Sequence, residues 1–145
     1  MEGLISMEPR QAKSIVIADD FAEFRRFIRS KLRGNGFHVV AEASDGLEAV
    51  AKAAELQPDL VLLDIQMPNL NGLEAAAQIR SVAPKSRILF VSQNTDPDIV
   101  QAGMSDGVAG YLCKSKVNRE LVPAIEAVLA GKRFASAQRG VPCVS

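Results

Sequence analysis

Acidic, hydroxyl and basic side chains directly follow short apolar runs at several points of this sequence. They are Asp19, Asp20, Asp64, Ser92 and Lys114. Three carboxylates held close together repel one another unless a divalent cation neutralises them, and such hard oxygen ligands suit Mg²⁺. Beside that ion, one carboxylate could attack phosphorus as a nucleophile. The residue types therefore indicate a cation and an anionic phosphoryl group bound side by side.

Two of these residues have further roles in such chemistry. The Lys114 ammonium could offset the charge on the transferring phosphoryl oxygens. The Ser92 hydroxyl could donate to a phosphoryl oxygen once an acyl phosphate has formed, a contact that the unmodified chain lacks. A contact made only in the modified state is what a molecular switch requires.

The polar residues stand at the ends of predicted strands. Strand-like apolar runs alternate with helical patterns five times, and this alternation predicts βαβ units around a parallel sheet. The runs are Ile15–Ala18, Val39–Ala43, Leu60–Leu63, Ile88–Val91 and Gly110–Lys114. Ligands of open parallel sheets bind at the carboxyl ends of the strands, so we expect these side chains to meet at one edge.

Helical spacing of apolar residues and capping residues predict the connecting helices. The first helix includes Phe24 to Leu32, and the fifth buries Leu121, Ile125, Val128 and Leu129, with Pro123 near its first turn. The second, third and fourth helices begin at Asp45, Asn71 and Asp96, respectively. We expect the second helix to bury Leu47, Val50, Ala51 and Ala54.

Composition restricts the class of protein. The 145 residues suit one globular domain, with 48% hydrophobic and 23% charged residues. Seventeen basic residues balance 17 acidic ones, so the chain lacks the basic surplus of a nucleic-acid binder. Cys113 and Cys143 lack metal-ligand spacing, and we expect free thiols. We expect His38 to be structural and the chain to be soluble and cytoplasmic, without a membrane span.

The ordered set of motifs resembles the receiver domains of response regulators in two-component signalling. The set is Asp19-Asp20, then Asp64-Ile65-Gln66-Met67-Pro68 followed by Gly72, then Ser92, then Gly110-Tyr111-Leu112-Cys113-Lys114-Ser115. Its last segment is most similar to the NarL/FixJ-type subfamily. The resemblance implies a flavodoxin-like (βα)5 fold, in which helices cover both faces of an open parallel five-stranded sheet of order 2-1-3-4-5.

The resemblance also implies a role for each site residue. Asp64 would accept a phosphoryl group from a sensor histidine kinase. Asp19, Asp20, Asp64 and the Gln66 carbonyl would hold Mg²⁺, and Ser92 and Lys114 would bind the phosphoryl oxygens. Tyr111 would be an aromatic switch that turns inward as Ser92 moves. The chain would be a signalling domain rather than an enzyme, apart from self-phosphotransfer and autodephosphorylation.

The domain organisation follows from the same resemblance. We expect a flexible segment over residues 1–12, the receiver domain over 13–131, and a linker or tail over 132–145. Related regulators usually carry a C-terminal helix-turn-helix domain that binds DNA. We expect this domain to be missing from the present chain. DNA contact and control of transcription would then need a domain outside this chain. Homodimers would form through the fourth helix, fifth strand and fifth helix, or through the first and fifth helices.

One departure from the family keeps a second function open. Gln93 follows Ser92, where receivers usually have Ala or Gly, and it could narrow access to Asp64. A receiver-like adaptor that binds its partner without phosphorylation is therefore an alternative. An aspartyl phosphatase is disfavoured because Gln66 stands where a second carboxylate is needed. A flavodoxin-like electron carrier is disfavoured because no phosphate-binding loop follows the first strand.

Overall fold

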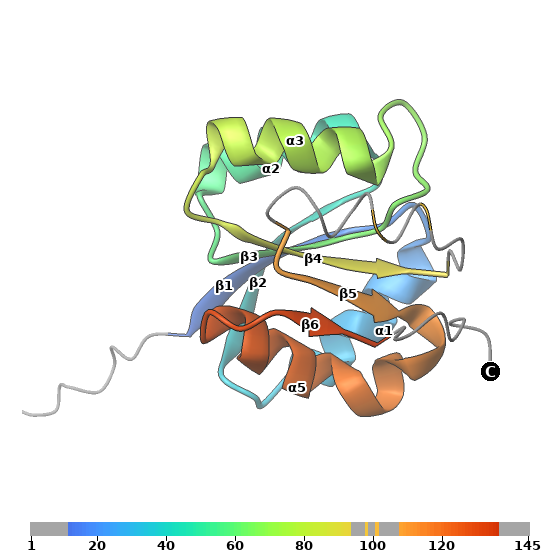
Figure 1. The fold of residues 1–145 in the computed structure, drawn as a ribbon, viewed down its shortest axis with the longest axis vertical. Coiled ribbons are helices and arrows are strands. Elements are labelled where there is room, and N and C mark those ends of the chain that lie inside the picture. Colours follow the sequence, from blue (N-terminus) through green and yellow to red (C-terminus); the bar gives the residue numbers. More distant parts are fainter. Residues whose placement is uncertain (1–11, 94–97, 99–100, 102–107, 137–145) are drawn as a thin grey trace, which may run out of the picture.

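The computed structural model describes residues 12–93, 98, 101 and 108–136 of the chain. These residues form a parallel sheet with helices on both faces (Figure 1). The strands are β1 (Lys13–Ala18), β2 (Phe37–Ala43), β3 (Leu60–Leu63), β4 (Arg87–Ser92), β5 (Gly110–Cys113) and β6 (Phe134–Ala135). The helices are α1 (Ala22–Leu32), α2 (Gly46–Leu56), α3 (Gly72–Val82), α5 (Val117–Leu129) and the 3₁₀ turn η2 (Lys114–Lys116).

The strand order is β2-β1-β3-β4-β5-β6, and every neighbouring pair is parallel. The expected flavodoxin-like fold and the order of its first five strands are confirmed. The expected strand count was one short, because β6 adds an edge strand beside β5. It lies within the segment expected to be a linker or tail. Phe134 N donates to Ala109 O, and Ser136 N donates to Tyr111 O.

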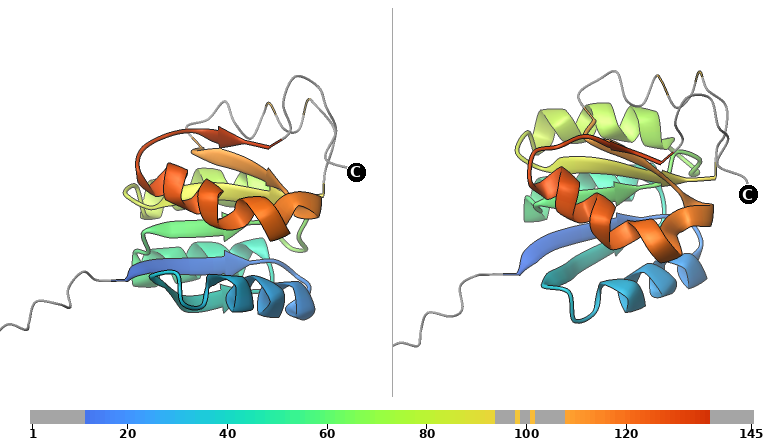
Figure 2. Two further views of the ribbon diagram at one scale, coloured as in Figure 1. Left: turned by 90° about the horizontal axis from the view of Figure 1, so that it is seen from below. Right: turned by 60° about the horizontal axis from the view of Figure 1, so that its bottom comes forward.

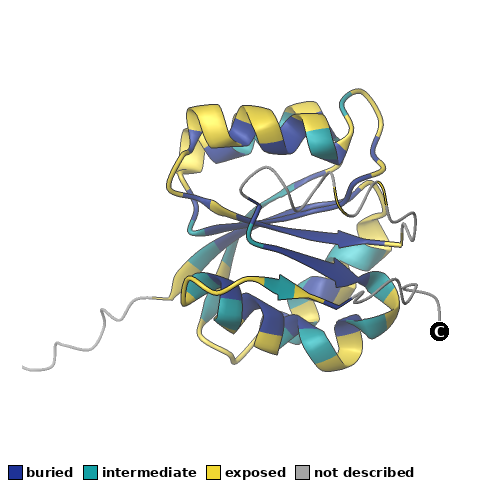
Figure 3. Cartoon of the chain, viewed as in Figure 1, coloured by how far each residue is buried: buried dark blue, intermediate teal, exposed yellow. Residues whose placement is uncertain are grey.

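The sheet separates two apolar cores. Helices α2 and α3 cover one face, whereas α1 and α5 lie side by side on the other, as the turned views show (Figures 1 and 2). Side chains of a strand alternate between the faces, so Val61 and Leu63 belong to the first core and Leu60 and Leu62 to the second. The central strands are thus buried on both sides (Figure 3), which explains their continuous apolar runs.

Helix starts follow the capping chemistry of the sequence. The Glu48 amide donates to Asp45 Oδ1 at 2.8 Å, and the Glu74 amide donates to Asn71 Oδ1 at 2.9 Å. These side chains satisfy amide groups that lack a partner within the helix. Both predicted starts are confirmed. The predicted start of the fourth helix at Asp96-Pro97 lies outside the described residues.

Two helix predictions were wrong in detail. Helix α2 buries Gly46, Ala49 and Ala53, whereas Leu47 is 55% exposed and only Val50 of the predicted stripe packs against the core. The small residues face inward because α2 packs closely on its neighbours: a Cβ on Gly46 would overlap the Leu70 backbone. Pro123 lies well inside α5, because the helix begins at Val117, earlier than its apolar stripe indicates.

Candidate metal and phosphoryl site

Three carboxylates from two neighbouring strands meet at the carboxyl edge of the sheet. Asp19 and Asp20 follow β1, and Asp64 follows β3, which pairs with β1 over its whole length. Asp64 N donates to Ala18 O at 3.0 Å, so backbone pairing continues to the site itself. One oxygen of each carboxylate lies within 4.8 Å of the others. The expected convergence of these residues is therefore present.

The cluster contains a buried carboxylate oxygen that suits a cation. Asp19 Oδ1 accepts from the Phe21 amide at 2.9 Å. Asp19 Oδ2 is buried, and its partner among the described residues is the Lys114 ammonium at 2.6 Å. A buried anionic oxygen without a full set of partners is costly. This oxygen, with an exposed Asp20 beside it, fits a hard divalent ion such as Mg²⁺.

Lys114 crosses from the end of β5 to the acidic cluster. Its Nζ lies 2.6 Å from Asp19 Oδ2 and 3.2 Å from Asp64 Oδ2. The ammonium also lies 4.4 Å from the centre of the Phe24 ring and 5.9 Å from that of Phe21. Aromatic faces attract cations, so these rings help to hold the ammonium. Neither phenylalanine was identified in the sequence as part of the site.

The acid and the base in this site shift one another's pKa. Burial raises the pKa of Asp64, the Lys114 charge lowers it, and the Asp19 charge raises it again, with a net rise. For Lys114, burial lowers the pKa, but the carboxylates of Asp19 and Asp64 outweigh it, so its pKa is raised. Lys114 is therefore a firm cation at neutral pH, whereas Asp64 binds a proton more readily than an ordinary aspartate.

Ser92 and Tyr111 form a second pair at the same edge of the sheet. Ser92 ends β4 and is buried, and Tyr111 is fully buried in the core beneath α2 and α3. Their side chains are hydrogen-bonded to each other. Burial raises the pKa of Tyr111, the Ser92 hydrogen bond lowers it, and the Asp64 charge raises it, with a net rise. The inward position of the Tyr111 ring is thus stabilised by Ser92.

A hollow of about 610 Å³ opens beside the carboxylates. Its lining includes Asp20, Gln66, Met67 and Asn71. The Gln66 backbone N–H donates to Asp64 Oδ1 at 3.4 Å, so this residue lies beside the central carboxylate. The predicted metal-binding role of its carbonyl stays a prediction. Gln93 is exposed at the end of β4.

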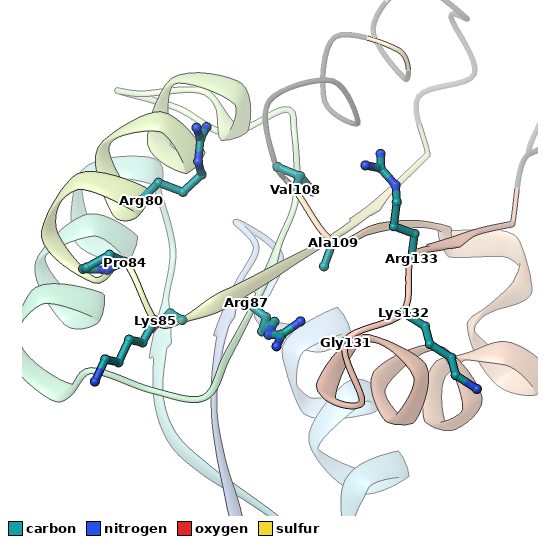
Figure 4. A pocket seen from close by; sticks show the side chains of 10 residues that line it. Arg80, Pro84, Lys85, Arg87, Val108, Ala109, Gly131, Lys132 and Arg133 are labelled. Atoms are coloured by element: carbon teal, nitrogen blue, oxygen red, sulfur yellow. The ribbon is translucent and has the colours of Figure 1, made fainter.

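A second hollow, of about 720 Å³, lies at the opposite edge of the sheet (Figure 4). Its lining includes the cations Arg80, Lys85, Arg87, Lys132 and Arg133, and no carboxylate from the described residues. The side chains of Lys85 and Lys132 diverge (Figure 4), and Arg87 Nη1 donates to Val128 O at 3.2 Å near the end of α5. The cationic side chains of this hollow complement the negative end of the α5 dipole. Because its lining is cationic, this hollow does not suit a metal ion.

The prediction of a free thiol at Cys113 was wrong. Cys113 is buried in β5 and is disulfide-bonded. The only other cysteine of the sequence, Cys143, lies outside the described residues. Spacing along a chain does not show which segments meet after folding. Here β6 brings the chain back along β5, and the Cys113 amide donates to Ser136 Oγ at 2.7 Å.

The parallel fold with an acidic cluster and a lysine at its carboxyl edge is typical of a signalling domain. Residues 15–126 match the family model of the response regulator receiver domain. This match covers most of the sequence, and the chain belongs to that family. The resemblance seen in the motifs is thereby confirmed.

Individual relatives support the same family. The chain is 38% identical to the transcriptional regulatory protein PdtaR of Mycobacterium tuberculosis, over 84% of this chain and 58% of PdtaR. It is 36% identical to the chemotaxis protein CheY of Listeria monocytogenes, over 77% of this chain and 94% of CheY. The chain thus matches somewhat more than half of one relative and nearly all of the other.

Solved structures agree with the sequence relatives. The signal receiver domain of the putative response regulator NarL from Mycobacterium tuberculosis has a TM-score of 0.79 and 32% identity. The similarity covers 84% of this chain and 99% of the NarL domain. The chain is accordingly a two-component receiver domain related to transcription regulators. No helix in the described part of the chain is long and apolar enough to cross a membrane.

Proposed function

We propose that Asp64 accepts a phosphoryl group in a Mg²⁺-dependent reaction and that the acyl phosphate switches dimerisation or the surface formed by the predicted fourth helix, β5 and α5. The observation that carries this proposal is the Lys114 ammonium, which lies within 3.2 Å of both Asp19 and Asp64 in the cluster of three carboxylates. The arrangement offers a nucleophile, a cation-binding set and a fixed positive charge. These are the parts that phosphoryl transfer to a carboxylate needs.

The transfer conserves atoms and charge in a simple way. An Asp64 carboxylate oxygen forms a bond to phosphorus, while the P–N bond of a phosphohistidine breaks and the leaving imidazole takes up a proton. Bound Mg²⁺, held by Asp19, Asp20, Asp64 and the Gln66 carbonyl, would supply charge neutralisation for the phosphoryl oxygens. Lys114 would supply a second positive charge, and Ser92 would supply a hydroxyl donor.

The proposed donor is the phosphohistidine of a sensor histidine kinase, in the cytoplasm. The chain then acts as a signalling domain whose own chemistry is limited to self-phosphotransfer and autodephosphorylation. We assign the receiver domain to residues 13–131, with β6 extending its sheet. Control of transcription would need a DNA-binding domain beyond this chain, because the 17 basic and 17 acidic residues leave no cationic surplus for DNA.

Ser92 and Tyr111 are the proposed switch. In the unmodified protein they are hydrogen-bonded to each other. The expected inward turn of Tyr111 does not fit this starting point, because the ring is already fully buried before Asp64 is modified. A new phosphoryl oxygen on Asp64 would instead compete for the Ser92 hydroxyl and weaken its hydrogen bond to Tyr111. Because Tyr111 lies in β5, a shift of its side chain would alter the surface formed by β5, α5 and the predicted fourth helix. A homodimer that formed through this surface would respond as well. The described edge of β5 is covered by β6, which therefore belongs to the responding surface.

Acetyl phosphate with MgCl₂ tests the chemical step directly. We expect intact-mass spectrometry to show one added phosphate on the unaltered protein and none on Asp64→Asn. Glu55→Gln is the control, because Glu55 is an exposed carboxylate of α2 away from the site. No adduct on the unaltered protein, or an adduct that persists in Asp64→Asn, would reject the proposed phosphoacceptor.

A receiver-like adaptor that needs no phosphate is the second candidate. The long polar Gln93 directly after Ser92 favours it, because an exposed side chain there could restrict access to Asp64. Gln93→Ala separates the two. Faster uptake of phosphate in the variant would mean that Gln93 only slows the reaction. Absence of phosphate uptake in both proteins would support the adaptor.

A further inference from the structure

One guanidinium ties the acidic site to the edge of the sheet. Arg25 Nη1 donates to the Asp19 carbonyl oxygen at 2.6 Å, and Arg25 Nε donates to Glu42 Oε1 at 2.7 Å. Arg25 lies near the start of α1, and Glu42 lies on β2. The loop after β1, the helix that follows it and the neighbouring strand are therefore joined through a single side chain.

The carbonyl that Arg25 holds belongs to the peptide between two of the three site carboxylates. Asp19 is fixed in other ways, because its amide donates to Ala43 O at 3.0 Å and its Oδ1 accepts from Phe21. Asp20 is different: its side chain is exposed, and no hydrogen bond from a described residue holds its carboxylate. The position of Asp20 therefore depends on its backbone, and thus on the peptide that Arg25 holds.

The anchor of Arg25 is itself well held. Glu42 Oε2 accepts a second hydrogen bond from Arg29 Nε at 2.8 Å. The Arg25 side chain is 16% exposed, against 42% for Arg29, so the Arg25 contact is the better shielded from solvent. Burial raises the pKa of Glu42, but its bonds to the two arginines outweigh this and lower it. Glu42 is therefore charged at neutral pH and can hold both guanidinium groups.

We infer that Arg25 is a positioning residue for the divalent cation, which holds the Asp19-Asp20 peptide so that the Asp20 carboxylate faces Asp64. This inference rests on the proposed Mg²⁺ site. A purely electrostatic role would have the opposite sign, because a cation close to the site repels Mg²⁺ and its removal would strengthen binding. Outer partners that orient metal ligands commonly contribute about 10- to 100-fold to metal affinity.

The test compares two arginines of the same helix that bind the same glutamate. Arg25→Gln removes the bond to the Asp19 carbonyl, whereas Arg29→Gln removes an equal charge and a bond to Glu42 but leaves Asp19 untouched. The measurement is a titration with MgCl₂ followed by isothermal calorimetry or NMR shifts, without any phosphoryl donor. We expect roughly tenfold weaker Mg²⁺ binding in Arg25→Gln and a change of less than about twofold in Arg29→Gln.

Each outcome decides a separate question. If the unaltered protein binds no Mg²⁺, the proposed function fails at its metal step. If it binds Mg²⁺ and Arg25→Gln binds equally or more tightly, or if both arginine variants weaken binding alike, the inference about Arg25 is wrong.

Thermal unfolding without metal shows whether each variant folds. If Arg25→Gln does not fold, Arg25→Lys takes its place, because one ammonium keeps the charge but lacks the planar fork that spans both oxygens. Mg²⁺ affinity in Arg25→Lys equal to that of the unaltered protein would then overturn the inference.

Discussion

The Lys114 ammonium lies 3.2 Å from Asp64 Oδ2, in a contact where the two side chains are 9% and 7% exposed. This contact brings together the residue that follows β5 and the carboxylate that follows the central strand β3. Burial alone would favour a protonated Asp64, and Lys114 is the main influence that opposes this. The ionised fraction of Asp64, which the proposed phosphoryl transfer needs, therefore depends mainly on burial, which raises the pKa, and on Lys114, which lowers it.

Removal of the Lys114 charge should raise the pKa of Asp64 further. In Lys114→Met, burial and the Asp19 charge would be opposed only by the weaker hydrogen bond from the Gln66 backbone amide. The measurement is a pH titration of the Asp64 carboxyl carbon by NMR. Lys116→Met is the matched control, because Lys116 Nζ lies 3.5 Å from the Ser136 carbonyl instead. An unchanged or lower Asp64 pKa in Lys114→Met would contradict the proposed electrostatic role.

Neutralising Asp64 should stabilise the protein at neutral pH. A carboxyl with a raised folded-state pKa binds protons more tightly in the folded state, so stability falls as pH rises from about the unfolded value of 3.8 through the folded pKa. Asp64→Asn removes this loss. We expect a higher melting temperature at pH 7 without Mg²⁺, and a difference that shrinks as the pH falls into that window.

Asp45→Asn is a control of opposite sign for this effect. Hydrogen bonds from the Glu48 amide and from Asn69 lower the pKa of Asp45, so its charge favours folding above the unfolded value of 3.8. The asparagine still caps α2 but loses the charge, and we expect lower stability at pH 7 that converges with the unaltered protein in acid. Equal signs for the two variants would show that the assigned pKa directions are wrong.

Tyr111 offers a direct optical probe of the switch pair. It is the only tyrosine of the chain, which has no tryptophan, so phenolate absorbance and tyrosine fluorescence report on this ring alone. We expect its ionisation above the ordinary pKa of 10.0. Ser92→Ala should raise the pKa further, because the Ser92 hydrogen bond lowers it, whereas Asp64→Asn should lower it. Shifts of the same sign in both variants would contradict the described contacts.

The sequence predicted those parts of the site that depend on strand ends. A run that is apolar on both faces, such as Leu60–Leu63, specifies a central strand, and the next residue must then lie at the carboxyl edge. Asp19, Asp64 and Lys114 therefore converge once the strand order is known. The capping of α2 and α3 was predictable for a different reason, because each cap joins residues only three apart in the sequence.

The features that the sequence missed depend on contacts between distant segments. The bond from Arg25 to the Asp19 carbonyl involves a backbone atom, which leaves no trace in residue types; the opposite charges of Arg25 and Glu42 were the only available signal. Leu47 was expected inside because it is apolar, but close packing of α2 selects Gly46, Ala49 and Ala53 instead. The two-residue β6 is too short to show periodicity.

Strand β6 nevertheless has a measurable role, because Ser136 satisfies a buried amide in the strand that carries Tyr111. The Cys113 amide donates to Ser136 Oγ at 2.7 Å, and both residues are buried. Ser136→Ala would leave that amide without its partner, so we expect a loss of about 1–3 kcal/mol in the free energy of unfolding, measured with urea. Ser30→Ala is the control, since the Ser30 hydroxyl bonds to Phe27 O at an exposed site and should change stability by less than about 0.5 kcal/mol. Equal stability of both variants would show that water replaces Ser136, and that β6 is not held to β5 through this side chain.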